Sequence, residues 1–338
     1  MSGGSVPYHL RQNKAVERNT FIELLQSVNR IEPIKDYTYV SFGGPYLEDF
    51  KWIHSALGLT KMISIEMDET VYARQSFNQP FGLLDCKHRT SGDFISHDID
   101  DSTPYIFWLD YASPNEIKDQ LIEFSQLIAK LKPMDIIKIT LNANPKTLGD
   151  PPTVKDKVTG DLRKATVDDK NEQRLHRLKS NLSEFLPPNL EKNSVSESNL
   201  PSVLLSCLKK AANKATQGSN QYCQPCSSFV YKDSEHQMLT LTLAILEKDS
   251  EKKIRFQDEV LKKWDLSNSD WDSPTKIFIP ELSIRERLYL DQNIHNQDPD
   301  DLMKELSFVF PERRDKMQII ESYKKFYRHL PQFSRVMV

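Results

Sequence analysis

The sequence predicts a doubly wound α/β fold, in which a mostly parallel sheet is closed by an antiparallel hairpin and followed by a helical C-terminal extension. Three observations predict it. Short runs rich in Ile, Val and Phe alternate with segments whose apolar residues recur at helical spacing, which is typical of a parallel sheet covered on both faces. Two further β-like runs, 228–231 and 237–246, flank a short polar turn. From about Ile254 the chain is charged and helical in pattern.

An N-terminal arm of residues 1–36 is expected to contain one helix. Thr20 and Glu23 have the form of a capping box, and apolar residues then recur at helical spacing as far as Val28. A basic run precedes this helix: His9, Arg11, Lys14 and Arg18. We favour a solvated basic face for this run, and contact with a substrate is the alternative.

Strands and helices then alternate through the first half of the chain. The strands are expected at 37–42, 61–65, 88–94, 105–109 and 135–141. The helices between them are expected at 47–57, 70–77 and 117–131. Right-handed crossovers between parallel strands place such helices on both faces of one sheet.

The second half of the chain changes character twice. Residues 147–199 are polar and rich in both charges, and one helix is expected at 171–186. We interpret this segment as a polar helical insertion into a sheet domain made of residues 37–146 and 200–247. A helix is expected from Leu200 to about residue 215, followed by the hairpin.

Residues 254–338 are expected to form a helical C-terminal region. Ser283 and Glu286 repeat the capping-box form ahead of an apolar pattern. A last helix is expected to begin at Pro311 or Glu312 and to end at Leu330.

Composition and charge exclude several classes of protein. Hydrophobic residues make up 38% of the chain, which is enough for a core, so the chain is not disordered overall. A net charge of −3 offers no overall field for nucleic acid. Neither a signal peptide nor an apolar run of membrane-spanning length is present, and four cysteines are too few for a disulfide framework. We therefore expect a cytoplasmic protein without a membrane partner.

Ligands of open α/β sheets bind beyond the carboxyl ends of the strands, where the strand order reverses. Gly43-Gly44-Pro45 follows the first strand, and glycines let the backbone approach a ligand closely. Glu66 ends the second strand, where a carboxylate can accept both hydroxyls of a ribose. Asp93 follows as a candidate acceptor for an exocyclic amine, and Asp110 ends the fourth strand at the mouth of the expected pocket.

These segments resemble the class I S-adenosylmethionine (SAM) methyltransferases over residues 37–146 and 200–247. The resemblance rests on Val40-Ser41-Phe42-Gly43-Gly44-Pro45, Ile63-Ser64-Ile65-Glu66, Ser91-Gly92-Asp93-Phe94 and Ile106-Phe107-Trp108-Leu109-Asp110-Tyr111. It implies a Rossmann-like sheet closed by the antiparallel pair.

The resemblance also implies roles for individual residues. Gly43, Gly44 and Pro45 line SAM, Glu66 holds its ribose, and Asp93 faces its adenine. Asp110 and Tyr111 lie near the methyl group as the catalytic pair, with Asp110 holding or deprotonating the acceptor.

Two functions stay open at this point. The first is SAM-dependent methyl transfer to an unknown acceptor. The second is a catalytically inactive, methyltransferase-like protein that binds a SAM-like nucleoside ligand, as a sensor or as a subunit of a complex with a protein partner.

Two further motifs favour structural interpretations. Cys223 and Cys226 supply only two of the four ligands that zinc needs, so no metal site is expected. Basic and aromatic residues are interleaved near the C-terminus, which keeps nucleic acid as a candidate partner but is more typical of a packed helix. They are Tyr323, Lys324, Lys325, Phe326, Tyr327, Arg328, Phe333 and Arg335.

Overall fold

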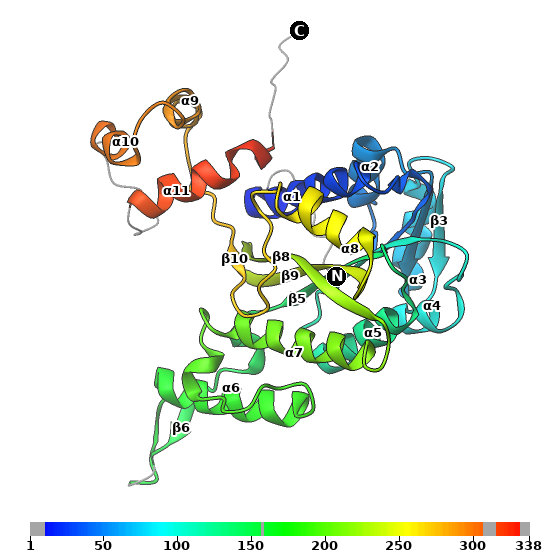
Figure 1. The fold of residues 1–338 in the computed structure, drawn as a ribbon. Helices are drawn as coiled ribbons and strands as arrows, with labels where there is room; N and C mark the ends of the chain where they lie inside the picture. Colours follow the sequence, from blue (N-terminus) through cyan, green and yellow to red (C-terminus); the bar gives the residue numbers. More distant parts are fainter. Residues whose placement is uncertain (1–10, 157–158, 307–315, 332–338) are drawn as a thin grey trace.

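A computed structural model describes residues 11–156, 159–306 and 316–331 of the chain. Its centre is an eight-stranded sheet with the order β10-β8-β9-β5-β4-β1-β2-β3 (Figure 1). The strands are β1 (Thr38–Ser41), β2 (Lys61–Glu66), β3 (Leu84–His88), β4 (Tyr105–Asp110), β5 (Ile136–Asn142), β8 (Gln221–Asp233), β9 (His236–Glu247) and β10 (Thr275–Lys276). A separate small ribbon pairs β6 (Thr153–Lys155) with β7 (Leu162–Lys164).

The strand directions confirm the predicted doubly wound sheet closed by a hairpin. β1 through β5 pair in parallel, β9 runs antiparallel to both β5 and β8, and the short β10 is parallel to β8. The sheet order reverses beside β1, because β1 pairs with β2 on one side and with β4 on the other.

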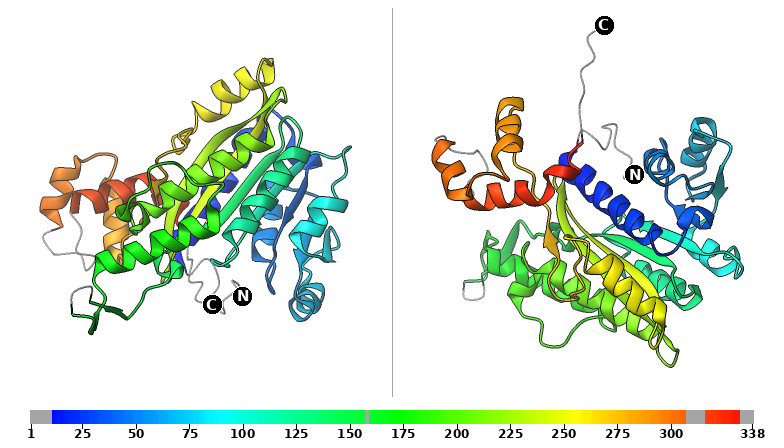
Figure 2. Two further views of the ribbon diagram at one scale, coloured as in Figure 1. Left: turned by 90° about the horizontal axis from the view of Figure 1, so that it is seen from below. Right: turned by 45° about the horizontal axis from the view of Figure 1, so that its top comes forward.

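Helices cover both faces of the sheet (Figures 1 and 2). One face is covered by α1 (Gln12–Asn29), α2 (Glu48–Leu57), α3 (Glu69–Asn78) and α8 (Glu251–Phe256). The other face is covered by α4 (Ser91–His97), α5 (Ile117–Lys130) and α7 (Leu200–Ala215), with α6 (Val167–Leu182) further out. The remaining C-terminal elements are η5 (Gln257–Leu261), α9 (Ile284–Asn293), α10 (Pro299–Glu305), α11 (Lys316–Phe326) and η6 (Tyr327–His329).

Alternation along the strands divides the core into two halves. Trp108 of β4 faces the core under α1, whereas Phe107 and Leu109 face the core under α5 and α7. In β5 the residues on the α5 side are aliphatic, but Lys138 and Thr140, on the α1 side, are polar and fully buried. The sheet face beneath α1 therefore needs polar partners.

The prediction for the third strand was wrong. β3 ends at His88, and the residues from Ser91 to His97 form α4. Thr90 caps this helix, because its hydroxyl accepts a hydrogen bond from the Asp93 amide at 3.1 Å. β3 is an edge strand with a mixed polar sequence, so it lacks the apolar run that marks buried parallel strands.

The predicted start of the first helix was also wrong. α1 begins at Gln12, and Thr20 lies within it, with its hydroxyl donating to the carbonyl of Glu17 at 2.7 Å instead of capping the helix. By contrast, the capping box of Ser283 and Glu286 is confirmed at the start of α9. The predicted start of the last helix, at Pro311 or Glu312, lies outside the described residues.

The outer side of α1 is tied to the C-terminal part of the chain. One carboxylate oxygen of Glu23 accepts hydrogen bonds from Trp264 Nε1 at 2.7 Å and from His329 Nε2 at 2.8 Å. Asn19 Nδ2 donates to the carbonyl of His329 at 2.8 Å. Near the start of the helix, Asn13 accepts the amide of Ile279 at 2.9 Å. Residues more than 200 positions away therefore hold α1 in place.

Within the described part of the chain, no helix combines the length and the apolar character that crossing a lipid bilayer requires.

We predict that Glu23→Gln lowers the free energy of unfolding at pH 7 by about 1–2 kcal/mol, because hydrogen bonds to a charged acceptor are lost. The hydrogen bond from His329 is the main reason that the pKa of Glu23 is lowered. A lowered carboxyl pKa contributes stability above the unfolded value of about 4.3, and this contribution is lost as the pH falls through the folded pKa. Urea unfolding at pH 7 and at about pH 3 checks this, and a difference that persists at low pH contradicts it.

The control for this prediction is Glu32→Gln. Glu32 pairs with Lys252 at the surface at 3.2 Å, and the lysine side chain is 61% exposed. Loss of such a pair is expected to change stability by less than about 1 kcal/mol.

Candidate active site

The carboxyl ends of β4, β1 and β2 lie side by side on one edge of the sheet, at the point where the strand order reverses. The turn containing Gly44 follows β1, Glu66 ends β2, and Asp110 ends β4. Ligands of doubly wound sheets bind at this place. The structure therefore gathers these three sequence-predicted positions on one edge.

The glycine turn is shaped by packing against its neighbours. A Cβ atom on Gly43 would lie 2.3 Å from Leu47 Cδ2 and 2.6 Å from Ser64 Oγ, so only glycine fits there. The Gly43 amide donates to Ser64 Oγ at 3.1 Å, so this amide points into the protein. Gly44 has a φ of 54°, a conformation that glycine adopts without strain. Pro45 follows, and its carbonyl accepts Asn78 Nδ2 at 2.8 Å.

The two remaining predicted cofactor residues differ in their surroundings. Glu66 is half-buried, and one carboxylate oxygen accepts the amide of Asp68 at 2.9 Å, which shapes the loop after β2. Asp93 is exposed in the first turn of α4, where its carboxylate accepts the hydroxyl of Thr90 at 2.7 Å. Asp93 thus belongs to a helix cap that follows the edge strand β3. In the strand order, it is the predicted site residue most remote from Asp110.

Asp110 is held by a cation from the N-terminal helix. Arg18 Nη2 lies 3.2 Å from Asp110 Oδ2, and the Asp110 side chain is only 14% exposed. Burial by itself favours the protonated carboxyl, but the positive charges of Arg18, Lys14 and Lys138 and a hydrogen bond from Thr140 together outweigh burial and lower the pKa of Asp110. Asp110 is therefore an ionised carboxylate at neutral pH and a weak base.

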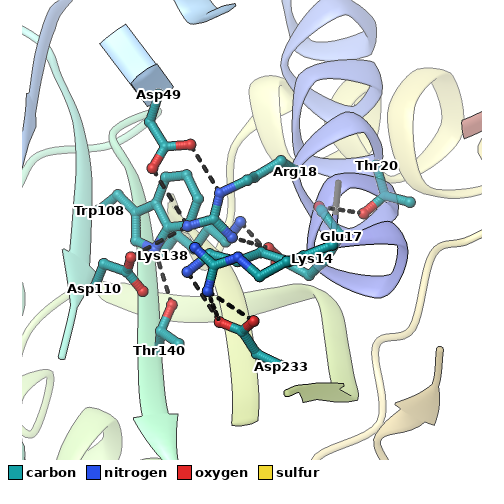
Figure 3. Close-up of polar contacts among 11 residues, drawn as sticks. Lys14, Glu17, Arg18, Thr20, Asp49, Trp108, Asp110, Lys138, Thr140 and Asp233 are labelled. Carbon is teal, nitrogen blue, oxygen red and sulfur yellow. Dashed lines mark hydrogen bonds and ion pairs between the residues drawn. The ribbon is translucent and has the colours of Figure 1, made fainter. Parts of the chain in front are cut away.

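Arg18 belongs to a buried group of charges that we call the α1 ionic cluster (Figure 3). The inward side of α1 supplies Lys14, Glu17 and Arg18, and Arg11 immediately precedes the helix. Their partners are Asp49 in the first turn of α2, Asp110 of β4, Lys138 of β5 and Asp233 at the end of β8. The cluster holds four cations and four carboxylates, so its formal charges cancel.

Contacts within the cluster are close. Arg18 Nε lies 2.8 Å from one oxygen of Asp49, and Glu17 lies 2.7 Å from Lys138 Nζ. The Lys138 ammonium also lies 3.6 Å from the ring centre of Trp108, a cation–π contact. Burial lowers the pKa of Lys138 and raises the pKa of Asp49, even though each has an oppositely charged neighbour.

Lys14 and Arg18 of the basic run are thus buried rather than solvated and Arg11 is half-buried, which reverses the interpretation that we favoured from the sequence; His9 lies outside the described residues. Arg18 is 1% exposed and Lys14 is 5% exposed. The sequence could not reveal this because their carboxylate partners are far along the chain, at positions 49, 110 and 233. The one available signal was their spacing, since residues 11, 14 and 18 share one side of a helix.

Comparisons with known proteins identify the family of the chain. The protein family described as "Putative O-methyltransferase" matches residues 6–338. The chain belongs to this family. It therefore falls within the class I SAM-dependent methyltransferases, as the sequence resemblance indicated. A search of curated proteins finds no match.

Solved methyltransferase structures are similar to the chain at low identity. The N-methyltransferase NodS from Bradyrhizobium japonicum is 7% identical with a TM-score of 0.36, covering 69% of this chain and 97% of that chain. The O-methyltransferase TomG from Streptomyces achromogenes, solved in complex with SAM, is 11% identical with a TM-score of 0.35, covering 68% and 79%. The plantazolicin methyltransferase BpumL, solved in complex with S-adenosylhomocysteine (SAH), is 10% identical with a TM-score of 0.38, covering 68% of this chain and 84% of that chain.

Tyr111, the second predicted catalytic residue of this methyltransferase, has its hydroxyl engaged elsewhere. It donates to Glu123 of α5, which also accepts Ser91 Oγ at 2.6 Å. The Tyr111 ring packs against Phe42, with ring centres 5.4 Å apart. Burial is the main reason that the pKa of Tyr111 is well above its ordinary value. Tyr111 is thus suited to form a wall of the site, and its hydroxyl is a poor proton donor or acceptor.

The cysteine pair and the C-terminal basic run have structural surroundings. Cys223 packs in the core under α7, whereas Cys226 packs in the core under α1, so the two thiols lie on opposite faces of the sheet. Burial raises the pKa of Cys223 to about 12. Tyr323 and Phe326 of α11 are fully buried, as expected of a packed helix. Phe333 and Arg335 lie outside the described residues.

We predict that Gly43→Ala destabilises the protein by about 1–3 kcal/mol, because the added methyl group must displace Leu47 and Ser64. Urea unfolding measures the change. The matched control is Gly82→Ala, where nothing lies within 4 Å of the added atom, so stability is expected to change by less than about 0.5 kcal/mol. Equal effects at both positions contradict the prediction.

A second prediction concerns the buried pair of Lys138 and Glu17. We expect Lys138→Met to cost about 3–5 kcal/mol, because it leaves the carboxylate of Glu17 buried without its closest cation. The double variant Glu17→Gln/Lys138→Met is expected to be more stable than Lys138→Met alone. A strictly additive double-mutant cycle in chemical denaturation would show that the two side chains are not coupled.

Proposed function

We propose that this protein binds SAM at the carboxyl ends of β4, β1 and β2 and catalyses methyl transfer to an oxygen atom of its acceptor. The observation that carries the proposal is the convergence of Glu66, the Gly44 turn and Asp110 at the reversal point of the sheet. Membership of an O-methyltransferase family supports both the cofactor and the acceptor atom.

The residues at this edge suit such a ligand. The carboxylate of Glu66 is placed to accept the ribose hydroxyls, and the turn at Gly44 allows close approach of the backbone. The half-buried rings of Phe42 and Tyr111 supply an apolar wall between β1 and β4. When bound, SAM would supply an electrophilic methyl group: a bond forms between the acceptor oxygen and the methyl carbon, the bond from sulfur to that carbon breaks, and S-adenosylhomocysteine is the leaving group.

Asp110 is assigned to positioning rather than to proton removal. Its pKa is lowered because neighbouring positive charges, with Arg18 first, and a hydrogen bond from Thr140 together outweigh the effect of burial, so it takes up a proton poorly at neutral pH. An ionised carboxylate in this place holds a positively charged or hydrogen-bond-donating group of a ligand. Catalysis then comes mainly from alignment of the two reactants.

We further propose that the protein works in the cytoplasm. All four cysteines are free thiols, which is typical of a reducing compartment. Fractionation of the source cells followed by immunodetection tests this, and recovery outside the cytoplasmic fraction would refute it.

We predict that SAM and S-adenosylhomocysteine (SAH) bind the wild-type protein and that Glu66→Ala weakens both by at least about tenfold, because hydrogen bonds to a charged acceptor are lost. Isothermal titration calorimetry measures both affinities. The matched control is Glu69→Ala, which removes an exposed glutamate from the first turn of α3 and is expected to change neither affinity. Absence of binding to the wild type would sink the proposal.

Turnover is tested separately by transfer of tritium from methyl-labelled SAM to a panel of hydroxyl and carboxyl compounds. Label on an oxygen atom supports the proposed reaction. Tight binding with no transfer to any compound favours the second hypothesis, a ligand-binding protein without catalysis.

A further inference from the structure

The wall that Tyr111 forms with Phe42 depends on a residue that lies away from the strand ends. Glu123 is in the middle of α5, and one of its carboxylate oxygens, Oε2, accepts the hydroxyl of Tyr111. The same oxygen accepts Ser91 Oγ, at the start of α4, at 2.6 Å. Glu123 therefore connects two helices to the loop that follows β4.

The carboxylate of Glu123 has little freedom to move. A Cβ atom added to Gly92 would lie 3.3 Å from Glu123 Oε1, so this oxygen rests against the backbone of α4. The helix that carries Glu123 is itself fixed, because its neighbouring residues Leu121 and Phe124 are fully buried in the core. The Tyr111 hydroxyl is thus bonded to a rigid acceptor.

Three contacts hold Tyr111, and they differ in what they fix. Its backbone amide donates to the carbonyl of Thr140 in β5 at 3.2 Å, which fixes the main chain. Its ring packs against Phe42 with the ring centres 5.4 Å apart, an apolar contact that several ring orientations allow. The hydrogen bond to Glu123 is directional and has a charged acceptor, which makes it about twice as strong as a neutral one. This bond therefore sets the orientation of the ring.

The orientation decides which part of Tyr111 a ligand meets. The hydroxyl is drawn to the side of the sheet that α4 and α5 cover, whereas Asp110 contacts Arg18 on the side that α1 covers. A ligand at the carboxyl ends of β1 and β4 therefore meets the ring of Tyr111 rather than its hydroxyl.

We infer that Glu123 is a positioning residue of the SAM site and acts through Tyr111. By accepting the hydroxyl, it keeps the ring beside Phe42 in the orientation that forms the wall, and Glu123 itself does not touch the ligand. The inference rests on the proposed function. It adds to the site a residue of α5, which no strand end supplies.

A double-mutant cycle measured by calorimetry with SAH tests the inference. Glu123→Leu removes the acceptor, and Tyr111→Phe removes the hydroxyl while keeping the ring. Each is expected to weaken SAH binding by about 3- to 10-fold, the value of one hydrogen bond. Because both changes break the same contact, the double variant is expected to bind within about twofold of either single variant. Glu123→Gln keeps an oxygen acceptor and is expected to stay within about twofold of wild type.

The matched control is Asp100→Leu. One oxygen of Asp100 also accepts two hydroxyls, those of Ser102 at 2.7 Å and Thr103 at 3.2 Å. Asp100 precedes β4, however, and so lies at the opposite end of that strand from Asp110. Its loss is expected to leave SAH affinity within about twofold of wild type.

A second comparison separates the two hydroxyls that Glu123 accepts. Ser91→Ala removes the contact with α4 and keeps the contact with Tyr111, so SAH affinity is expected to stay within about twofold of wild type. Urea unfolding shows which variants are folded. If Glu123→Leu does not fold, the comparison of Tyr111→Phe with Ser91→Ala carries the test.

Fluorine magnetic resonance of protein labelled with 3-fluorotyrosine reports on the ring without any ligand. The Tyr111 resonance is identified by its loss in Tyr111→Phe. It is expected to move in Glu123→Leu, or in Glu123→Gln to a smaller extent, and to stay in place in Asp100→Leu. A general loss of stability would not move the resonance of one ring alone.

The outcomes separate this inference from the proposed function. If the wild type binds SAH and Glu123→Leu binds it equally well, or if the two single effects add in the double variant, the inference is wrong and the SAM site stands. An unchanged Tyr111 resonance in Glu123→Leu overturns it as well. If the wild type does not bind SAH, the proposed function fails and the inference fails with it.

Discussion

The guanidinium of Arg18 joins three elements that are distant in the sequence, since it contacts Asp49 of α2 and Asp110 of β4 from its position on α1. A buried arginine is tolerated only where carboxylates surround it, because a charge without partners is expensive to remove from water. The positions of α1, α2 and the end of β4 are thus fixed together. The edge of the sheet where ligands of this fold bind takes its shape from that requirement.

The polar side of β5 explains why α1 carries charges on its buried side. Lys138 points toward α1, and a purely apolar helix could not cover it without leaving its ammonium group unpaired. Glu17 of α1 forms an ion pair with Lys138. Trp108 contacts the Lys138 ammonium through its ring and donates a hydrogen bond from Nε1 to the Thr140 hydroxyl at 2.9 Å. The helix and the sheet face are complementary in charge as well as in shape.

The sequence predicts the fold well where burial leaves a strong pattern. β4 and β5 are nearly continuous apolar runs, and the long second arm of the hairpin is recognisable in the same way. β3 was misplaced because its edge position leaves it polar. The strand-end positions of Glu66 and Asp110 could be predicted from local sequence, but the role of Arg18 could not, since its environment is assembled from residues remote in the chain.

The two sides of α1 face different parts of the molecule. Its inner side reaches Asp110 through Arg18, and its outer side is hydrogen-bonded through Glu23 to Trp264 and His329. Coupling between two such contacts is reciprocal: whatever C-terminal docking contributes to ligand affinity, the ligand contributes equally to docking. We therefore expect occupancy at the far side of α1 to change the stability of α11 and η6. Slower amide hydrogen exchange around Tyr323 upon ligand addition would be the observable form of that linkage.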